Sequence, residues 1–183
     1  EDREVHVARA AGRVRYPAKF MLVATRNPCP CGYYGDKDHS CSCSLNQIIS
    51  YEKRISGPLL DRIDMIVPVA RVNEKHLLAH SSSPESPAIR ERVAASRAAQ
   101  YSRNGGTTNA ELPSKNIAKT TLLGQAATDL LNNAADRMKL SARSYFKVIK
   151  VARTIADLDN ATEVLPQHIA EALQYRQKAS EIH

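Results

Sequence analysis

The chain has 183 residues, of which 43% are hydrophobic and 25% charged, as in ordinary soluble globular proteins. No apolar run reaches the roughly 20 residues of a membrane-spanning helix, and the charged start EDREVHVARA argues against a signal peptide, so we expect a cytoplasmic protein. The net charge of +7 favours an anionic partner such as nucleic acid, although a solvated basic surface explains it equally well.

Residues 4–16 (EVHVARAAGRVRY) alternate between apolar and polar side chains around a turn at residues 10–12, which predicts a β-hairpin. The predicted apolar face consists of Val5, Val7, Val14 and Tyr16. The opposite face is basic and comprises His6, Arg13 and Arg15, with Arg9 near the turn. These cations suit contacts with phosphate groups, and a solvated polar face is the alternative.

Two short apolar runs predict buried strands. KFMLVAT (19–25) is continuous and ends just before Asn27, whereas MIVPV (65–69) contains a proline that places it at a strand end or a sheet edge. Between them, NQIISYEKRIS (46–56) predicts a short helix and PLLDRID (58–64) a helical turn.

The second half of the chain is helical in its apolar period. HSSSPESP (80–87) predicts a linker, and four helices are expected beyond it. They are centred on residues 88–103, 123–138 and 145–156 and on a segment that begins at Pro166, with Ser144 as a candidate N-cap of the third. The expected fold class is therefore an α/β piece (1–79) followed by an all-α domain of about four helices (88–183).

Three stretches closely resemble the magnesium-chelatase-like AAA+ ATPases of the ComM/YifB type: FMLVATRNPCPCGYYGD, RISGPLLDRIDM and LSARSYFKVIKVARTIADLDNATEVLPQHIAEALQYR. The resemblance covers nearly the whole chain in the same order. It implies the C-terminal part of an AAA+ core followed by a helical lid, in an ATPase that assembles into a ring of six subunits. It also implies that Asn27 is sensor 1, Arg62 the arginine finger and Arg143 sensor 2.

The residue types fit these implied roles, and each has a simpler alternative. Asn27 follows a predicted buried strand, where α/β sheets bind ligands, but an asparagine before proline is also a common turn residue. Arg143 stands at a predicted helix start, where phosphate is favoured, but a basic residue near a cap needs no ligand.

Arg62 lies between Asp61 and Asp64. A surface ion pair with either carboxylate is the simple interpretation, and such pairs contribute little. The functional interpretation is a guanidinium that enters a neighbouring subunit's active site and neutralises charge on the transferring phosphoryl group.

Two motifs that ATP hydrolysis requires do not occur in the sequence. It contains no G-x-x-x-x-G-K-[ST] loop and no apolar strand that ends in Asp-Glu. The resemblance places both motifs upstream of Glu1, and the hairpin at 4–16 in the insertion that precedes sensor 1. We therefore expect this chain to be part of a longer protein that uses ATP and Mg²⁺, and to be inactive by itself.

All four cysteines of the chain, Cys29, Cys31, Cys41 and Cys43, lie in one loop with C-x-C spacing inside each pair. Four thiolates in two close pairs can form a tetrahedral site for a structural Zn²⁺, and His39 could replace one of them. The spacing is shorter than in the usual zinc fingers, and disulfides or four thiols without metal are the alternatives.

Three functions remain open at this point. The resemblance implies a hexameric motor that drives DNA branch migration, with DNA and other copies of the chain as partners. A chelatase-type ATPase that remodels a protein partner is the second, and a module that binds nucleic acid or supports assembly without catalysis is the third.

Overall fold

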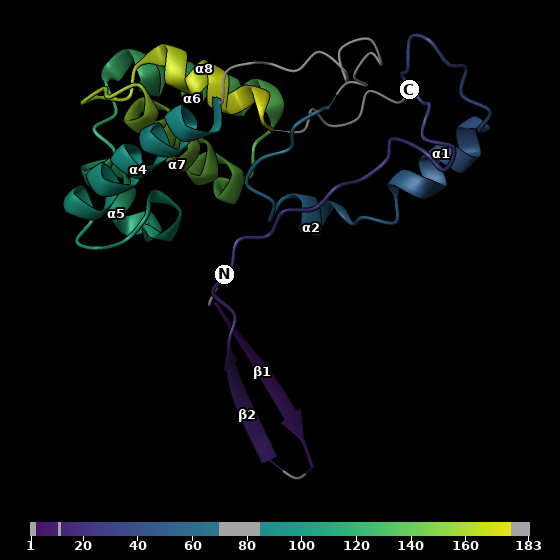
Figure 1. The fold of residues 1–183 in the computed structure, drawn as a ribbon, viewed down its shortest axis with the longest axis horizontal. Helices are drawn as coiled ribbons and strands as arrows, with labels where there is room; N and C mark the ends of the chain where they lie inside the picture. Colours follow the sequence, from purple (N-terminus) through teal and green to yellow (C-terminus); the bar gives the residue numbers. More distant parts are fainter. Residues whose placement is uncertain (1–2, 11, 70–84, 177–183) are drawn as a thin grey trace. The chain divides into compact units, whose positions relative to one another are not determined.

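The computed structural model describes residues 3–10, 12–69 and 85–176 (Figure 1). Backbone packing divides the chain into two compact units, Glu1–Arg54 and Ile55–His183. In these described ranges, no helix has both the length and the apolar character that crossing a bilayer requires.

The predicted hairpin is confirmed. Strand β1 (Glu4–Arg9) pairs antiparallel with β2 (Gly12–Pro17), with Val5 opposite Tyr16 and Val7 opposite Val14. His6 lies opposite Arg15 and Ala8 opposite Arg13, so the basic side chains share the other face, as expected from the two-residue period of a strand. Tyr16 and Val14 are about half exposed, so the apolar face is not packed against a core.

The two predicted buried strands are not present in the structure. Residues 19–25 and 65–69 are irregular, and Val23 and Val69 are 82% and 87% exposed. An apolar run becomes a buried strand only where neighbouring strands supply hydrogen bonds and helices cover its faces. Among the described residues, the sheet consists of β1 and β2 alone.

The helix after the cysteine loop forms close to its predicted position. Helix α1 (Leu45–Glu52) begins after Ser44, whose hydroxyl accepts a hydrogen bond from the backbone N–H of Gln47 at 3.3 Å. The Gln47 side chain accepts one from the Ser44 N–H at 2.8 Å, which completes a capping box. This cap fixes the backbone directly behind Cys43.

The second unit is helical. Its elements are α2 (Gly57–Leu60), α4 (Glu85–Arg103), the 3-10 helix η1 (Asn109–Glu111), α5 (Ser114–Thr120), α6 (Gln125–Met138), α7 (Ala142–Leu158) and α8 (Pro166–Gln174). Helix α7 lies at the centre and contacts α4, η1, α5 and α8, while α6 packs on α8 (Figure 1). The architecture is consistent with an α/β piece followed by a helical region.

Several boundaries in this unit differ from the prediction. Helix α4 begins at Glu85, inside the predicted linker, whose earlier residues lie outside the described ranges. Helix α5 and η1 were not predicted, because each is too short to show a helical period. The N-cap of α7 is Ser141, not Ser144, and the Ser141 hydroxyl accepts a hydrogen bond from the Ser144 N–H.

The apolar face of α7 forms the core of this unit with side chains of α5, α6 and α8. Its buried members include Ile117, Leu131, Val148, Ala152 and Ile169. A row of apolar residues at steps of three and four places them on one side of each helix, and burying them against one another supplies the driving force for folding.

A buried polar cluster joins four parts of the helical unit. The carboxylate of Asp157 accepts two hydrogen bonds from Arg103, at 2.7 and 2.8 Å, and others from Asn109 and Arg153. Arg153 is almost wholly buried and also donates to the carbonyl of Thr162 at 2.8 Å. Burial lowers the pKa of Arg153, although the Asp157 carboxylate opposes that shift.

Candidate functional site

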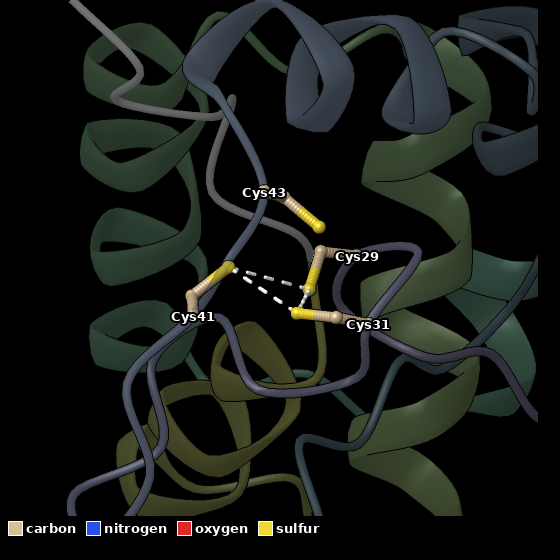
Figure 2. A group of neighbouring side chains, drawn as sticks. All are labelled: Cys29, Cys31, Cys41 and Cys43. Atoms are coloured by element: carbon tan, nitrogen blue, oxygen red, sulfur yellow. Dashed lines mark hydrogen bonds between the residues drawn. The ribbon is translucent and has the colours of Figure 1, made fainter.

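The four cysteine side chains converge in space. Figure 2 shows Cys29 and Cys31 facing Cys41 and Cys43, and the four Sγ atoms all lie within 4.8 Å of one another. The Sγ of Cys29 lies 3.3 Å from that of Cys31 and 3.7 Å from that of Cys41, and Cys31 and Cys41 are 3.5 Å apart. None of the four forms a disulfide in the structure.

Turns in the loop bring the sulfurs together. The N–H of Gly32 donates to the carbonyl of Cys29 at 3.1 Å, and Gly32 adopts a φ of +86°, which favours glycine. The N–H of Tyr34 then donates to the Sγ of Cys29 at 3.3 Å. Cys29 is fully buried.

The sulfur geometry fits a tetrahedral metal ion. Zinc–sulfur bonds of about 2.3 Å at tetrahedral angles separate the ligand sulfurs by about 3.8 Å. The three sulfur–sulfur separations of 3.3–3.7 Å need only small adjustments to reach that value. The cluster is therefore compatible with a structural zinc ion bound by four cysteines.

The thiols influence one another strongly. The backbone N–H of Tyr33 lowers the pKa of Cys31 to about 5, against the effect of burial. At Cys41 the N–H of Cys43 also favours the thiolate, but burial and the sulfurs of Cys31 and Cys29 outweigh it and raise the pKa to about 12. Thiolates this close repel one another, and a bound divalent cation would relieve that repulsion.

His39 lies outside the sulfur cluster. Its ring stacks on Tyr33 with 5.1 Å between the centroids, and its Nδ1 lies 3.7 Å from a carboxylate oxygen of Asp36. The structure thus groups the four cysteines without the histidine that the sequence offered as a substitute ligand.

Asn27 lies in the irregular segment just before the cysteine loop and is exposed. The preceding guanidinium, that of Arg26, lies 5.5 Å from the ring centroid of Tyr51 at the end of α1, within range of a cation–π contact. Asn27 therefore lies in the chain between Arg26, which contacts Tyr51, and Cys29, the first residue of the cysteine cluster.

Arg62 lies just beyond α2 and is exposed. Its guanidinium donates to the carbonyl of Pro58 at 2.9 Å. The flanking carboxylates contact other side chains, because Asp61 accepts hydrogen bonds from Ser144 and Asp64 pairs with Lys147. Within the part of the chain that the structure describes, neither carboxylate forms an ion pair with Arg62, which was the simple interpretation of this residue.

Arg143 is the second residue of α7, and its guanidinium lies 3.6 Å from the carboxylate of Asp61. Arg62 and Arg143 thus belong to one packed unit, in which Asp61 lies beside both. Asn27 and the cysteines belong to the other unit.

Sequence reasoning did not predict that Asp61, Ser144 and Arg176 contact one another at this junction. The sequence contains a signal for Arg176, because this charged residue continues the apolar side of α8. A charged side chain in such a position needs a partner. Ser144 and Asp61 are 83 positions apart, and no local pattern relates them.

The basic side chains of the hairpin are exposed. Arg13 and Arg15 point to the same face, and Arg15 forms an ion pair with Glu4 on the neighbouring strand. Arg9 ends β1 opposite Gly12 and by alternation lies on the face of Val7.

Comparison with known proteins identifies the family. Residues 1–77 match the family described as magnesium chelatase, subunit ChlI, and residues 83–176 match its C-terminal family. The chain belongs to the magnesium chelatase subunit ChlI family. It is a chelatase-related AAA+ protein similar to the ComM/YifB group.

Three relatives illustrate the similarity. The chain is 37% identical over 177 residues to competence protein ComM of Haemophilus influenzae and 35% identical over 177 residues to the protein YifB of Salmonella typhimurium. It is 36% identical over 180 residues to the protein Rv2897c of Mycobacterium tuberculosis. These alignments cover 96–97% of this chain but only 34–35% of each relative, so the chain spans about a third of their length.

Proposed function

We propose that this chain supplies the sensor and arginine-finger part of an ATP-driven ring motor that acts on DNA. The observation that carries the proposal is the junction between α2 and α7, which presents Arg62 and Arg143 from one packed unit. Two exposed guanidinium groups held by rigid elements suit the stabilisation of charge on a phosphoryl group in transfer.

The assigned roles follow the chemistry of each group. The amide of Asn27 would orient the attacking water or contact the γ-phosphate, and Arg143 would contact a phosphate of the bound nucleotide. Arg62 would reach the nucleotide of a neighbouring subunit, which requires assembly into a ring, and six subunits are the proposed number. The Mg²⁺-holding acid and the phosphate loop would come from the rest of the whole protein, so the 183-residue chain alone should not hydrolyse ATP.

DNA is the proposed partner because the hairpin carries arginines on an exposed two-stranded ribbon and the chain has a net charge of +7. One relative is named a competence protein, which agrees with a role in handling incoming DNA. Branch migration of DNA strands is the specific activity proposed.

A structural Zn²⁺ bound by Cys29, Cys31, Cys41 and Cys43 is part of the proposal. Four protein ligands leave no open coordination position, so the ion would hold the loop in shape rather than take part in the reaction. The geometry of the sulfurs supports it.

The second candidate function is a chelatase-type ATPase that remodels a protein partner, and the family description favours it. An electrophoretic shift assay of the whole protein on branched and linear DNA, with ATP hydrolysis followed in parallel, separates the candidates. Binding of branched DNA with stimulated hydrolysis is expected. Hydrolysis without DNA binding would favour the chelatase type, and DNA binding without hydrolysis would favour a non-catalytic module.

A further inference from the structure

The carboxylate of Asp61 is the centre of a polar cluster at the N-terminus of α7. Its Oδ1 accepts a hydrogen bond from the Ser144 hydroxyl at 2.6 Å and one from the Ser141 hydroxyl at 3.1 Å. A guanidinium nitrogen of Arg176, from the end of α8, donates to the Ser144 hydroxyl at 2.6 Å and lies 3.6 Å from the same Oδ1. We name these four residues the Asp61 cluster: Asp61, Ser141, Ser144 and Arg176.

Each hydroxyl group of the cluster both donates and accepts a hydrogen bond. Ser141 donates to Asp61 and accepts from the N–H of Ser144, as the N-cap of α7. Ser144 donates to Asp61 and accepts from Arg176. Because both hydroxyl groups donate and accept a hydrogen bond, the cluster favours one arrangement of α2 against α7 and α8.

The residues after Asp61 are attached to the same two helices through their backbone. The ammonium of Lys147, on α7, donates to the carbonyl of Arg62, and Arg176 donates to the carbonyl of Ile63 at 2.9 Å. Further on, the N–H of Ile66 donates to the carbonyl of Tyr175 at 2.9 Å. The Asp61 side chain before Arg62 and the main chain from Arg62 onward are therefore both bonded to the helical unit.

Electrostatics favour the ionised form of Asp61. Its pKa is lowered chiefly by the hydrogen bond from Ser144, with further contributions from Ser141, Arg176 and Arg143 that together outweigh burial. A group whose folded pKa is lowered contributes stability above its unfolded pKa and loses it as the pH falls. The carboxylate also lies at the N-terminus of α7, where the helix dipole favours a negative charge.

We propose that Asp61 is a positioning residue that fixes Arg62 to the helical unit, so that the arginine finger moves with α7 and α8 as one body. This inference rests on the proposed function of Arg62. It gives the motor a mechanical connection, because a rotation of the helical unit in one subunit moves the finger that serves the neighbouring nucleotide. The distance between the finger and that nucleotide then depends on the position of the helical unit.

The test compares Asp61→Asn with Arg62→Ala and with the double variant in the whole protein. Asparagine keeps the size of the side chain but loses the charge, which lets the α2 turn shift. ATP hydrolysis should fall by about 10–100-fold, since a misplacement of about 1 Å can cost 10²-fold in rate, while the nucleotide Kd stays within about twofold. In the Arg62→Ala background the same change should have almost no further effect, because Asp61 acts through Arg62.

Hydrogen exchange supplies a readout that does not depend on catalysis. Asp61→Asn should speed amide exchange at Ile66, whose N–H donates to the carbonyl of Tyr175 just beyond α8, and leave the α6–α8 core unchanged. Ser144→Ala, which removes the shared hydroxyl, should act in the same direction with a smaller effect. Asp64→Asn is the matched control, because its carboxylate is 66% exposed and such pairs contribute little.

The outcomes separate the inference from the proposed function. If Arg62→Ala hydrolyses ATP normally, the finger assignment itself is wrong. If Arg62→Ala is inactive but both Asp61→Asn and Ser144→Ala exchange and hydrolyse like the unmodified protein, only the positioning role is overturned. In the double variant, the fold-losses in hydrolysis rate caused by Asp61→Asn and Arg62→Ala could simply multiply. That result would show that Asp61 acts on general stability and not through Arg62.

Discussion

Twelve buried apolar side chains form one core in Ile55–His183, whereas in the described part of Glu1–Arg54 the buried apolar residues are Cys29 and Ile48. The second unit also buries a polar cluster around Asp157. In the first unit the residues 20–23 are exposed although all four are apolar. The difference indicates that the two units are ordered by different forces.

A unit without a core needs another source of order, such as a metal ion or the surface of a partner. The cysteine cluster suits a metal ion, and the exposed apolar run at residues 20–23 suits the surface of a partner. The helical unit, by contrast, can hold side chains such as Arg62 in place with its own contacts.

If the proposed zinc ion is bound, its removal should disorder the cysteine loop and leave the helices intact. Structural zinc sites of this kind bind with about 10–16 kcal/mol at neutral pH, which is far more than the burial of Cys29 and Ile48 supplies. The 183-residue chain, purified under reducing conditions, should contain about one zinc per chain. Cys29→Ser should lose the metal with little change in helical circular dichroism, and cobalt in its place should give thiolate charge-transfer bands.

Ser42→Ala is the matched control, since it alters the same loop and keeps all four sulfurs. It should retain the metal. Elemental analysis that finds no zinc in unmodified protein prepared without chelators would falsify the metal site, and the order of the first unit would then need another explanation.

Arg62→Ala in the whole protein should abolish hydrolysis but not nucleotide binding. Arginine fingers contribute on the order of 10³–10⁵ in rate, whereas the phosphate loop supplies most ground-state contacts. Lysine should rescue poorly, because a point charge does not reproduce the planar guanidinium. Steady-state hydrolysis and nucleotide titration measure both quantities.

Mixing experiments test whether Arg62 acts across a subunit boundary. Arg62→Ala chains combined with chains that are inactive in the phosphate loop should regain some activity, because an intact loop can then face an intact Arg62. Arg137→Ala, which removes an exposed arginine from the same unit, is the control and should keep the normal rate. Normal hydrolysis by a folded, assembled Arg62→Ala variant would make Arg62 an ordinary surface residue.

Asp157→Ala should destabilise the helical unit by about 3–5 kcal/mol, because it leaves the buried charge of Arg153 and the partly buried charge of Arg103 without their carboxylate. Urea unfolding followed by far-ultraviolet circular dichroism measures this change. Asp129→Ala, at an exposed position on α6, should change stability by less than about 0.5 kcal/mol. Equal effects of the two substitutions would contradict the importance of the buried cluster.

The same contrast explains what the sequence could predict. The register of the hairpin and the start of α8 at Pro166 follow from local rules, namely the two-residue period and the preference of proline for the first helical turn. The strands at 19–25 and 65–69 were wrong because a strand requires a partner that no local pattern supplies. The Asp61 cluster was missed for a related reason, since it joins residues about 80 positions apart.

The smallest expected effect concerns the hairpin of the first unit. Arg9, Arg13 and Arg15 are exposed, so their replacement by alanine should leave folding unchanged. In the whole protein the triple variant should bind DNA more weakly, by a similar factor for all sequences. The slope of log K against log salt should become shallower by about 0.9 per lost phosphate contact, since each contact releases counterions.

A variant with the same change in net charge separates contact from general attraction. Arg90, Arg92 and Arg97 are exposed on α4 in the helical unit, and replacing them with alanine also lowers the charge by three. If the hairpin contacts DNA directly, its triple variant should make the slope of log K against log salt shallower by about two to three. The α4 variant should change this slope much less. Single substitutions refine the result, because Arg13 and Arg15 share a face and should matter more than Arg9. Equal losses from both triple variants would mean that the net charge of the protein attracts DNA without a defined hairpin contact.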